Sequence, residues 1–281
     1  MKKLLSISLL LALVSCGENA PAKAEKVKVS KQEEKRTNAE AALDPLRSVQ
    51  EKKQFPNGIQ IQWFVKGAGA QVQDGHVYLI NYKVTLEDGT VVDGNHLLQR
   101  PTLPFLVGFG LQTKGWDLAM PELHIGDFAE LYLPGNLARG KKGVPGLIPP
   151  NAPNRIFIRV VSEMQPTKMV QGTKVWLLEE NKDHADSLIS AKSEVAVHYF
   201  VGSKSNPKYD NSYEQGKPFV FGMSDRSIVP GLKNALLGAK DFDKLWVVVP
   251  ADQAYGHQGI PDLVKPDEQM FYDLLIVSHR N

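Results

Sequence analysis

The sequence predicts an α+β protein of two tandem domains, in each of which a twisted antiparallel sheet wraps around one short helix. Three observations carry this prediction: a repeat of whole-domain length, runs rich in β-branched and aromatic residues, and one helical stretch between the early and late strands of each copy. A sheet with a helix on its concave face buries both apolar surfaces within about 110 residues.

The repeat follows from the residue numbers. Tyr82 and Asp93 recur 117 positions later as Tyr199 and Asp210. After a shift of one residue the offset is 116, which pairs Phe105 with Phe221, Gly115 with Gly231, Pro134 with Pro250, Gly140 with Gly256, Gly143 with Gly259, Pro145 with Pro261 and Pro150 with Pro266. This period exceeds the ~20–50 residues of a solenoid unit, so it indicates duplication of a whole domain. The copies are expected at 55–165 and 172–281.

Early strands are expected at 76–84 and 194–200, where β-branched and aromatic residues are dense. Asp88-Gly89 predicts a hairpin turn, because this pair readily adopts left-handed conformations. Later strands are expected at 128–133, 155–161, 244–249 and 270–277. The helical stretches are expected at 116–123 and 232–239, each preceded by a glycine.

The composition is that of an ordinary globular protein, with 42% hydrophobic and 23% charged residues among 281. With 33 basic and 31 acidic side chains the net charge is +2, which offers no electrostatic basis for nucleic-acid binding. The seven histidines show no pair at metal-ligand spacing, so no metal is expected. The oligomeric state is left open.

The first residues have the layout of an export signal. Lys2 and Lys3 precede the apolar run 4–14, which is well short of the ~20 residues that a spanning helix needs. A buried N-terminal helix is the alternative, although no polar face accompanies the run. We expect a signal peptide at 1–15.

The string Leu13-Val14-Ser15-Cys16 resembles a lipobox, in which the cysteine carries a diacylglycerol. Cys16 is the only cysteine, so stability must come from packed cores rather than disulfides. The resemblance implies a lipid-anchored protein of the cell envelope whose soluble part is periplasmic, and Gly17 favours the outer membrane. Residues 16–54 are expected to form a charged tether, within which 38–53 has the composition of a marginal helix with some capacity to dimerise.

Two sets of motifs resemble the FKBP family of peptidyl-prolyl cis-trans isomerases in order and spacing. The first copy carries Leu86-Glu87-Asp88-Gly89, Lys114-Gly115-Trp116 and Leu147-Ile148-Pro149-Pro150. The second carries Tyr209-Asp210, Pro218-Phe219, Val229-Pro230-Gly231-Leu232, Ala254-Tyr255-Gly256 and Gly259-Ile260-Pro261. The resemblance implies that each domain is a half-barrel of antiparallel strands around one helix, acting on proline-containing polypeptides without a cofactor.

The chemistry of such an enzyme explains why no catalytic dyad is needed. Rotation about a prolyl amide has a barrier near ~20 kcal/mol because twisting destroys resonance, and no covalent bond breaks. An enzyme need only bind the twisted state better than the planar ones, which a dry aromatic pocket with a hydroxyl donor achieves.

By this resemblance the better-kept pocket lies in the second copy. Tyr199, Asp210 and Tyr255 take the catalytic roles, and Tyr255 donates its hydroxyl to a substrate carbonyl. The proline-binding walls are Tyr209, Phe219, Ile228, Val229, Leu232, Val264 and Tyr272. Two simpler interpretations remain: aromatic residues on strands are often plain core, and Asp210 fits a turn or capping position.

The first copy keeps Tyr82, Asp93, Trp116 and Ile148 as substrate-binding positions, but it departs from the pattern elsewhere. Arg139 stands in place of the hydroxyl-bearing tyrosine, Val92 and Leu103 replace aromatics, and Gln112 and Thr113 replace aliphatics. Two functions therefore stay open: an isomerase that assists folding of exported proteins, with catalysis mainly in the second domain, or a non-catalytic FKBP-fold chaperone or binding lipoprotein.

Overall fold

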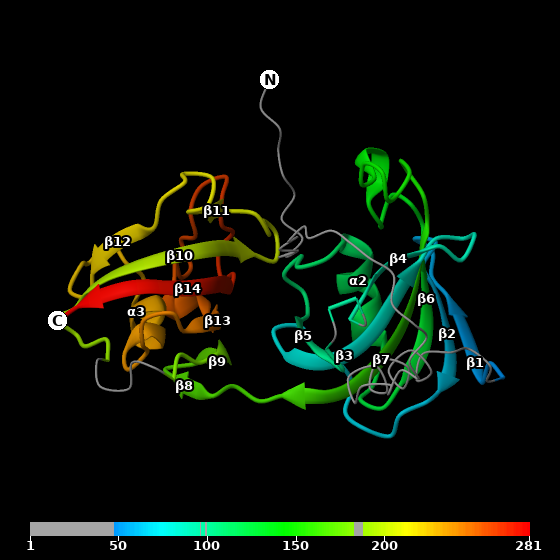
Figure 1. Ribbon diagram of the computed structural model, residues 1–281, viewed down its shortest axis with the longest axis horizontal. Coiled ribbons are helices and arrows are strands. Elements are labelled where there is room, and N and C mark those ends of the chain that lie inside the picture. The colour runs from blue at the N-terminus through cyan, green and yellow to red at the C-terminus, as the bar shows by residue number, and fades with distance from the viewer. Residues whose placement is uncertain (1–47, 96, 99, 183–187) are drawn as a thin grey trace, which may run out of the picture.

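The computed structural model describes residues 48–95, 97–98, 100–182 and 188–281. Two domains lie side by side, each built on a seven-stranded sheet, and the chain passes between them once, from β7 to β8 (Figure 1). The expected signal peptide, Cys16 and most of the expected tether lie outside the described residues.

The first domain contains one antiparallel sheet in the order β1-β2-β6-β7-β3-β4, with β5 paired to β3. Its elements are β1 (Glu51–Gln54), β2 (Gln60–Val65), β3 (Val77–Thr85), β4 (Val91–Gly94), β5 (Leu103–Leu106), α2 (Lys114–Ala119), η1 (Met120–Glu122), β6 (Phe128–Leu133), η2 (Gly140–Lys142) and β7 (Asn154–Met164).

The second domain repeats this topology as β8-β9-β13-β14-β10-β11, with β12 paired to β10. Its elements are β8 (Lys168–Val170), β9 (Thr173–Glu179), β10 (Glu194–Ser203), β11 (Asp210–Asn211), β12 (Phe219–Gly222), α3 (Pro230–Leu236), β13 (Lys244–Val249), η3 (Ala251–Gln253) and β14 (Met270–Arg280). Strands β6 and β13, and β7 and β14, match residue for residue at the offset of 116. The duplication and the α+β fold predicted from the sequence are confirmed.

Three boundaries differ from expectation. Residues 51–54 form an edge strand paired with β2. The prediction of a helix over 38–53 is therefore wrong for 51–53. The second sheet likewise begins at Lys168, four residues before the expected 172. Both helices begin two residues earlier than expected. In α3 the early start is favoured by Pro230, which fits the first turn of a helix. Helix α2 gives way to the 3-10 turn η1, which contains Pro121.

Each domain has its own core between the sheet and its helix. Leu131 and Ile158 in the first, and Val247 and Leu274 in the second, are fully buried. Lys168 Nζ donates to the carbonyls of Asn234 (2.6 Å) and Leu237 (2.7 Å) at the end of α3, which fixes this helix to the second sheet.

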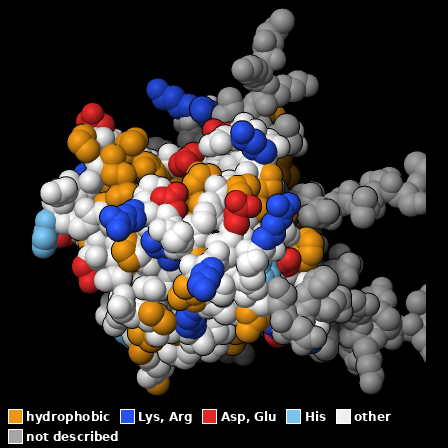
Figure 2. Space-filling view, turned by 90° about the vertical axis from the view of Figure 1, so that its left-hand side faces the viewer, with side chains coloured by type: hydrophobic (Ala, Val, Ile, Leu, Met, Phe, Trp, Pro, Cys, Tyr) orange, Lys and Arg blue, Asp and Glu red, His pale blue; other side chains and the backbone are white. Residues whose placement is uncertain are grey.

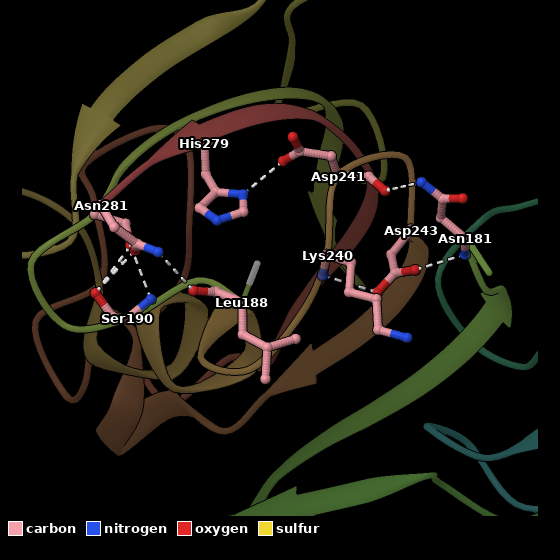
Figure 3. A network of polar contacts seen from close by, with 9 residues as sticks. Asn181, Leu188, Ser190, Lys240, Asp241, Asp243, His279 and Asn281 are labelled. Atoms are coloured by element: carbon pink, nitrogen blue, oxygen red, sulfur yellow. Dashed lines mark hydrogen bonds and ion pairs between the residues drawn. The ribbon is translucent and has the colours of Figure 1, made fainter. Parts of the chain in front are cut away.

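A buried aspartate closes the same turn in both domains. Asp127, fully buried, accepts hydrogen bonds from the backbone of Gly67 (2.6 Å) and His124 (2.9 Å). Asp243, 116 positions later, accepts from the backbone of Asn181 (2.9 Å) and Lys240 (2.9 Å) (Figure 3). Because each carboxylate satisfies amides that the turn leaves unpaired, this aspartate is part of the repeated scaffold.

The helices of the described residues and one face of the surface bear on how the molecule meets its surroundings. Within the described residues, no helix is long and apolar enough to cross a bilayer. On the side of the second domain that looks away from the first, basic, acidic and apolar side chains are interspersed (Figure 2).

Candidate functional site

The candidate site of the second domain lies where four strands and the start of one helix meet. Strand β10 supplies Tyr199, β11 supplies Asp210, β12 supplies Phe219, and β14 supplies Tyr272. The start of α3 supplies Val229 and Leu232, which are 9% and 7% exposed. Ile228, Val264 and Tyr272 are buried in the same cluster, and Tyr199, Tyr209 and Tyr255 pack against it while half-exposed.

Aromatic rings form the open side of this site. Tyr199 meets Phe219 edge to face, with ring centroids 5.9 Å apart, and Tyr209 meets Tyr255 in the same way at 6.5 Å. Phe219 is 41% exposed and marks the rim. Phe221, which was not singled out from the sequence as a site residue, packs on Phe219 with ring centroids 5.3 Å apart. Its repeat partner Phe105 was the available signal.

The Asp210 carboxylate is held by its own neighbours rather than by a cation. Tyr199 donates its hydroxyl to Asp210 Oδ2 (2.5 Å), and the backbone N–H of Asn211 donates to Oδ1 (2.8 Å). Burial, followed by the hydrogen bond and charge of Asp210, raises the pKa of Tyr199 well above its usual range. Asp210, in strand β11, thus binds the hydroxyl of Tyr199 and the backbone amide of the next residue, and it lies beside the aromatic site.

Phenol groups gather around Tyr255. Burial, followed by the neighbouring phenol of Tyr209, raises the pKa of Tyr255 to about 12. Burial and the phenol of Tyr255 raise the pKa of Tyr272 well above its usual range. These hydroxyls therefore remain protonated at neutral pH and act as donors.

Glycine backbones hold the loop that carries Tyr255 and Val264. The amide of Ile260 donates to the Val264 carbonyl (2.8 Å), and the amide of Val264 donates to the Ile260 carbonyl (2.9 Å). Gly259 has φ +60°, and a Cβ at this residue would lie 2.3 Å from the Val264 carbonyl oxygen. Only glycine fits this close approach, so it fixes how Tyr255 and Val264 face the pocket.

The arrangement is suited to hold an apolar ring and to donate a hydrogen bond to a carbonyl at its mouth. The apolar walls exclude water, and the tyrosine hydroxyl is an uncharged donor whose protonation does not change near neutral pH. No acid, base or nucleophile is required for rotation about a bond. Among the described residues, no group of three or more His, Cys, Asp or Glu side chains is placed to hold a metal ion.

The predicted aromatic residues of the corresponding site in the first domain are almost fully buried. Trp116 on α2 is 3% exposed and contacts the rings of Tyr82 and Phe105, each at 5.3 Å. Tyr82 is only 6% exposed, and its hydroxyl donates to Asp93 at 3.3 Å. Ile148 is buried in the same cluster.

Arg139 occupies the position of Tyr255 in this first site. Its guanidinium donates to Gln112 Oε1 (3.1 Å), so two of the residues that depart from the family pattern bind each other at this site. The structure thus brings together the predicted residues of both domains, but only those of the second leave aromatic surface open.

Two comparisons with known proteins concern this fold and site. The sequence model of the family described as FKBP-type peptidyl-prolyl cis-trans isomerase matches residues 69–160 and 186–277, one match in each domain. Peptidyl-prolyl cis-trans isomerase FKBP10 of Mus musculus is 26% identical over 211 residues, which are 74% of this chain and 35% of that protein. The chain therefore spans about a third of the length of this relative.

A shorter relative matches at higher identity. FK506-binding protein 1 of Kluyveromyces lactis is 45% identical over 80 residues, which are 28% of this chain and 68% of that protein. Among solved structures, the three FKBP domains of wheat FKBP73 align with a TM-score of 0.40 and 22% identity, covering 80% of this chain and 96% of that one.

Proposed function

Since the chain belongs to the FKBP-type peptidyl-prolyl cis-trans isomerase family, with one family match in each domain, we propose that it isomerises X-Pro bonds and that the second domain carries the catalysis. The proline ring enters between Tyr199, Phe219 and Leu232. Tyr255 donates its hydroxyl to a carbonyl of the substrate, and Asp210 lies beside the twisting amide.

The observation that carries this proposal is the difference in exposure between the two sites. Tyr199, Tyr209 and Tyr255 are half-exposed and Phe219 is 41% exposed, whereas Tyr82 is 6% exposed beneath Trp116. A substrate ring can only bind where aromatic surface is accessible. The second site has such accessible surface, whereas in the first site the aromatic side chains are buried against one another.

The test is the rate of cis to trans conversion of a short X-Pro peptide by the whole chain. We expect acceleration over the uncatalysed rate and a decrease of about fivefold in kcat/KM for Tyr255→Phe, the loss of one hydrogen bond worth ~1 kcal/mol. Absence of acceleration by a chain whose circular dichroism shows it folded would refute the isomerase proposal and leave a binding module.

We also propose that this activity serves exported proteins and that the chain is anchored by lipid on Cys16 in the cell envelope, with the outer membrane favoured. The support is the sequence pattern from Lys2 to Cys16. In bacterial cells given a labelled fatty acid, the wild-type chain should incorporate label and fractionate with membranes, whereas Cys16→Ala should do neither. Equal labelling of both chains would contradict the anchor.

The first domain favours the second candidate function, binding without catalysis. Its Arg139–Gln112 pair offers polar groups at the mouth of a closed site, where a guanidinium cannot reproduce the position of a tyrosine hydroxyl. A first domain that does not isomerise is consistent with the assignment of catalysis to the second.

A further inference from the structure

The two domains meet through an apolar cluster to which both contribute, here called the interdomain cluster. Its buried members are Val77, Leu106 and Phe109 of the first domain and Trp176, Trp246, Val248 and Phe271 of the second, all at most 9% exposed. The rings of Phe109 and Phe271 lie 5.8 Å apart across the boundary. Separation of the domains would expose apolar surface of this cluster to water, so the contact is favoured by burial.

Comparison of the repeats shows that this contact is specialised. Trp246 and Phe271 point to the outer face of the second sheet, opposite the inward residues Val247 and Tyr272. The residues 116 positions earlier are Glu130 and Arg155, which form an ion pair on the first sheet. The outer face is therefore apolar in the domain that the other one covers.

The loop that enters the interface is specialised in the same way. Asp117 on α2 accepts hydrogen bonds from the backbone of Gly108 (3.0 Å) and Gly110 (2.8 Å), which holds the loop so that Phe109 projects from it. The residue 116 positions after Phe109 is Asp225, which is exposed. An aromatic residue thus stands at this loop position only in the domain whose loop meets a partner surface.

The same loop touches a segment that leads into the second site. A Cβ on Gly110 would lie 2.5 Å from Pro207 Cβ, so the backbone of Gly110 lies directly against the proline ring. Lys204, three residues earlier, forms an ion pair with Asp74 of the first domain. Pro207 is followed by Lys208, Tyr209 and Asp210, so the first domain restrains the chain just before two site residues.

The segment between Val264 and Tyr272 is hydrogen-bonded to the segment that contains Pro207. Glu268, between Val264 and Tyr272, accepts hydrogen bonds from the hydroxyls of Ser203 and Ser205, both at 2.7 Å. Gln269 faces Gly75 of the first domain: a Cβ added to Gly75 would lie 3.3 Å from Gln269 Oε1. A cavity of about 250 Å³ lies at this boundary and is lined by residues of both domains.

We propose that the first domain acts as a positioning domain for the second site, with Phe109 and Gly110 as its positioning residues. This inference rests on the proposed isomerase activity of the second domain. No residue of loops 204–208 and 265–269 belongs to the buried core of the second domain. Docking of the first domain reduces the number of conformations in which these loops present Tyr209, Asp210 and Val264. Preorganised walls bind the substrate and its twisted state better than mobile ones.

The test uses the whole chain carrying Phe109→Ala, with Phe64→Ala as the matched control. Phe64 is 4% exposed and packs on Phe128 at 5.2 Å within the first domain, so its truncation removes the same side chain away from the interface. We expect Phe109→Ala to raise KM severalfold and to lower kcat/KM by about tenfold, within the ~100-fold that a displacement of about 1 Å can cause. Phe64→Ala should leave KM at the wild-type value, because lost stability reduces only the amount of active enzyme.

Amide hydrogen exchange provides a readout that does not depend on activity. Phe109→Ala should speed exchange in residues 203–210 relative to the wild type, and Phe64→Ala should not. Should Phe109→Ala fail to fold, Phe109→Leu replaces it, with smaller changes in the same direction. Unchanged KM and unchanged exchange in residues 203–210 would overturn the inference, whereas an inactive wild-type chain would refute the proposed function instead.

Discussion

The two sites of this molecule share a backbone and differ in the side chains that fill it. Gly143 and Gly259 have φ +54° and +60°, and a Cβ at either would lie 2.3 Å from a carbonyl oxygen of the same loop. A tyrosine donates to an aspartate in both sites. Yet Arg139 stands in one site where Tyr255 stands in the other. The duplicated fold therefore does not guarantee a duplicated function, which depends on the side chains at the mouth of each site.

The largest expected effect is a difference in kcat/KM between alanine substitutions at Gly259 and at Gly143. Gly259→Ala and Gly143→Ala introduce the same clash and the same backbone strain, so each should destabilise its own domain by about 2–4 kcal/mol. Only Gly259→Ala should also lower kcat/KM, by about 100-fold, because it displaces Tyr255 and Val264. Chemical denaturation and the peptide assay measure the two quantities. Equal losses of activity would show that both sites contribute to catalysis.

A smaller effect, on stability alone, is expected at the buried aspartate that both domains share. Asp127→Ala and Asp243→Ala each leave buried backbone amides unpaired, so both should destabilise by about 2–3 kcal/mol. Asp127 should cost more, because it also accepts from Trp63 Nε1 (2.8 Å). Thermal unfolding, followed by circular dichroism, measures the loss of stability of each variant. A negligible change for either would mean that water replaces the carboxylate.

The smallest effect concerns pH. Free tyrosine titrates at about pH 10. The folded second site raises the pKa of Tyr255 to about 12 and raises the pKa of Tyr272 well above its usual range. The stability that depends on these protonated phenols is thus complete below about pH 10 and is lost as the pH rises towards about 12. Tyr255 should not titrate near neutral pH, so kcat/KM should be flat from about pH 6 to about pH 9. Tyr255→Phe should lessen the alkaline loss of stability, and a sloping rate profile near neutrality would contradict this account.

Much of the fold was predictable because the repeat and the strand patterns are local signals. Strand β6 was predicted with its observed bounds, and β7 to within a few residues. Strand β1 was missed, since its four residues are all exposed and lack the alternation of a half-buried strand. Its structure depends on pairing with β2, which no local pattern records.

The site was predictable only in part. Family spacing pointed to Tyr199, Asp210 and Tyr255, which the fold brings together, but the burial of Tyr82 and Trp116 in the first site is visible only in the structure. The interdomain cluster was missed because an apolar residue on a strand predicts burial without saying against what. The change of polarity between repeat partners, Glu130 to Trp246 and Arg155 to Phe271, was the signal that went unused.

The most direct test of catalysis in the second domain compares matched double variants of the whole chain. One carries Ile228→Ala and Tyr255→Phe, and the other carries the changes at the repeat-related positions, Gln112→Ala and Arg139→Ala. We predict that the first lowers kcat/KM on an X-Pro peptide by about tenfold or more, the loss of one hydrogen bond and part of an apolar wall, while the second stays within about twofold of the wild type. Equal decreases, or a larger decrease in the second variant, would contradict the assignment of catalysis to the second domain.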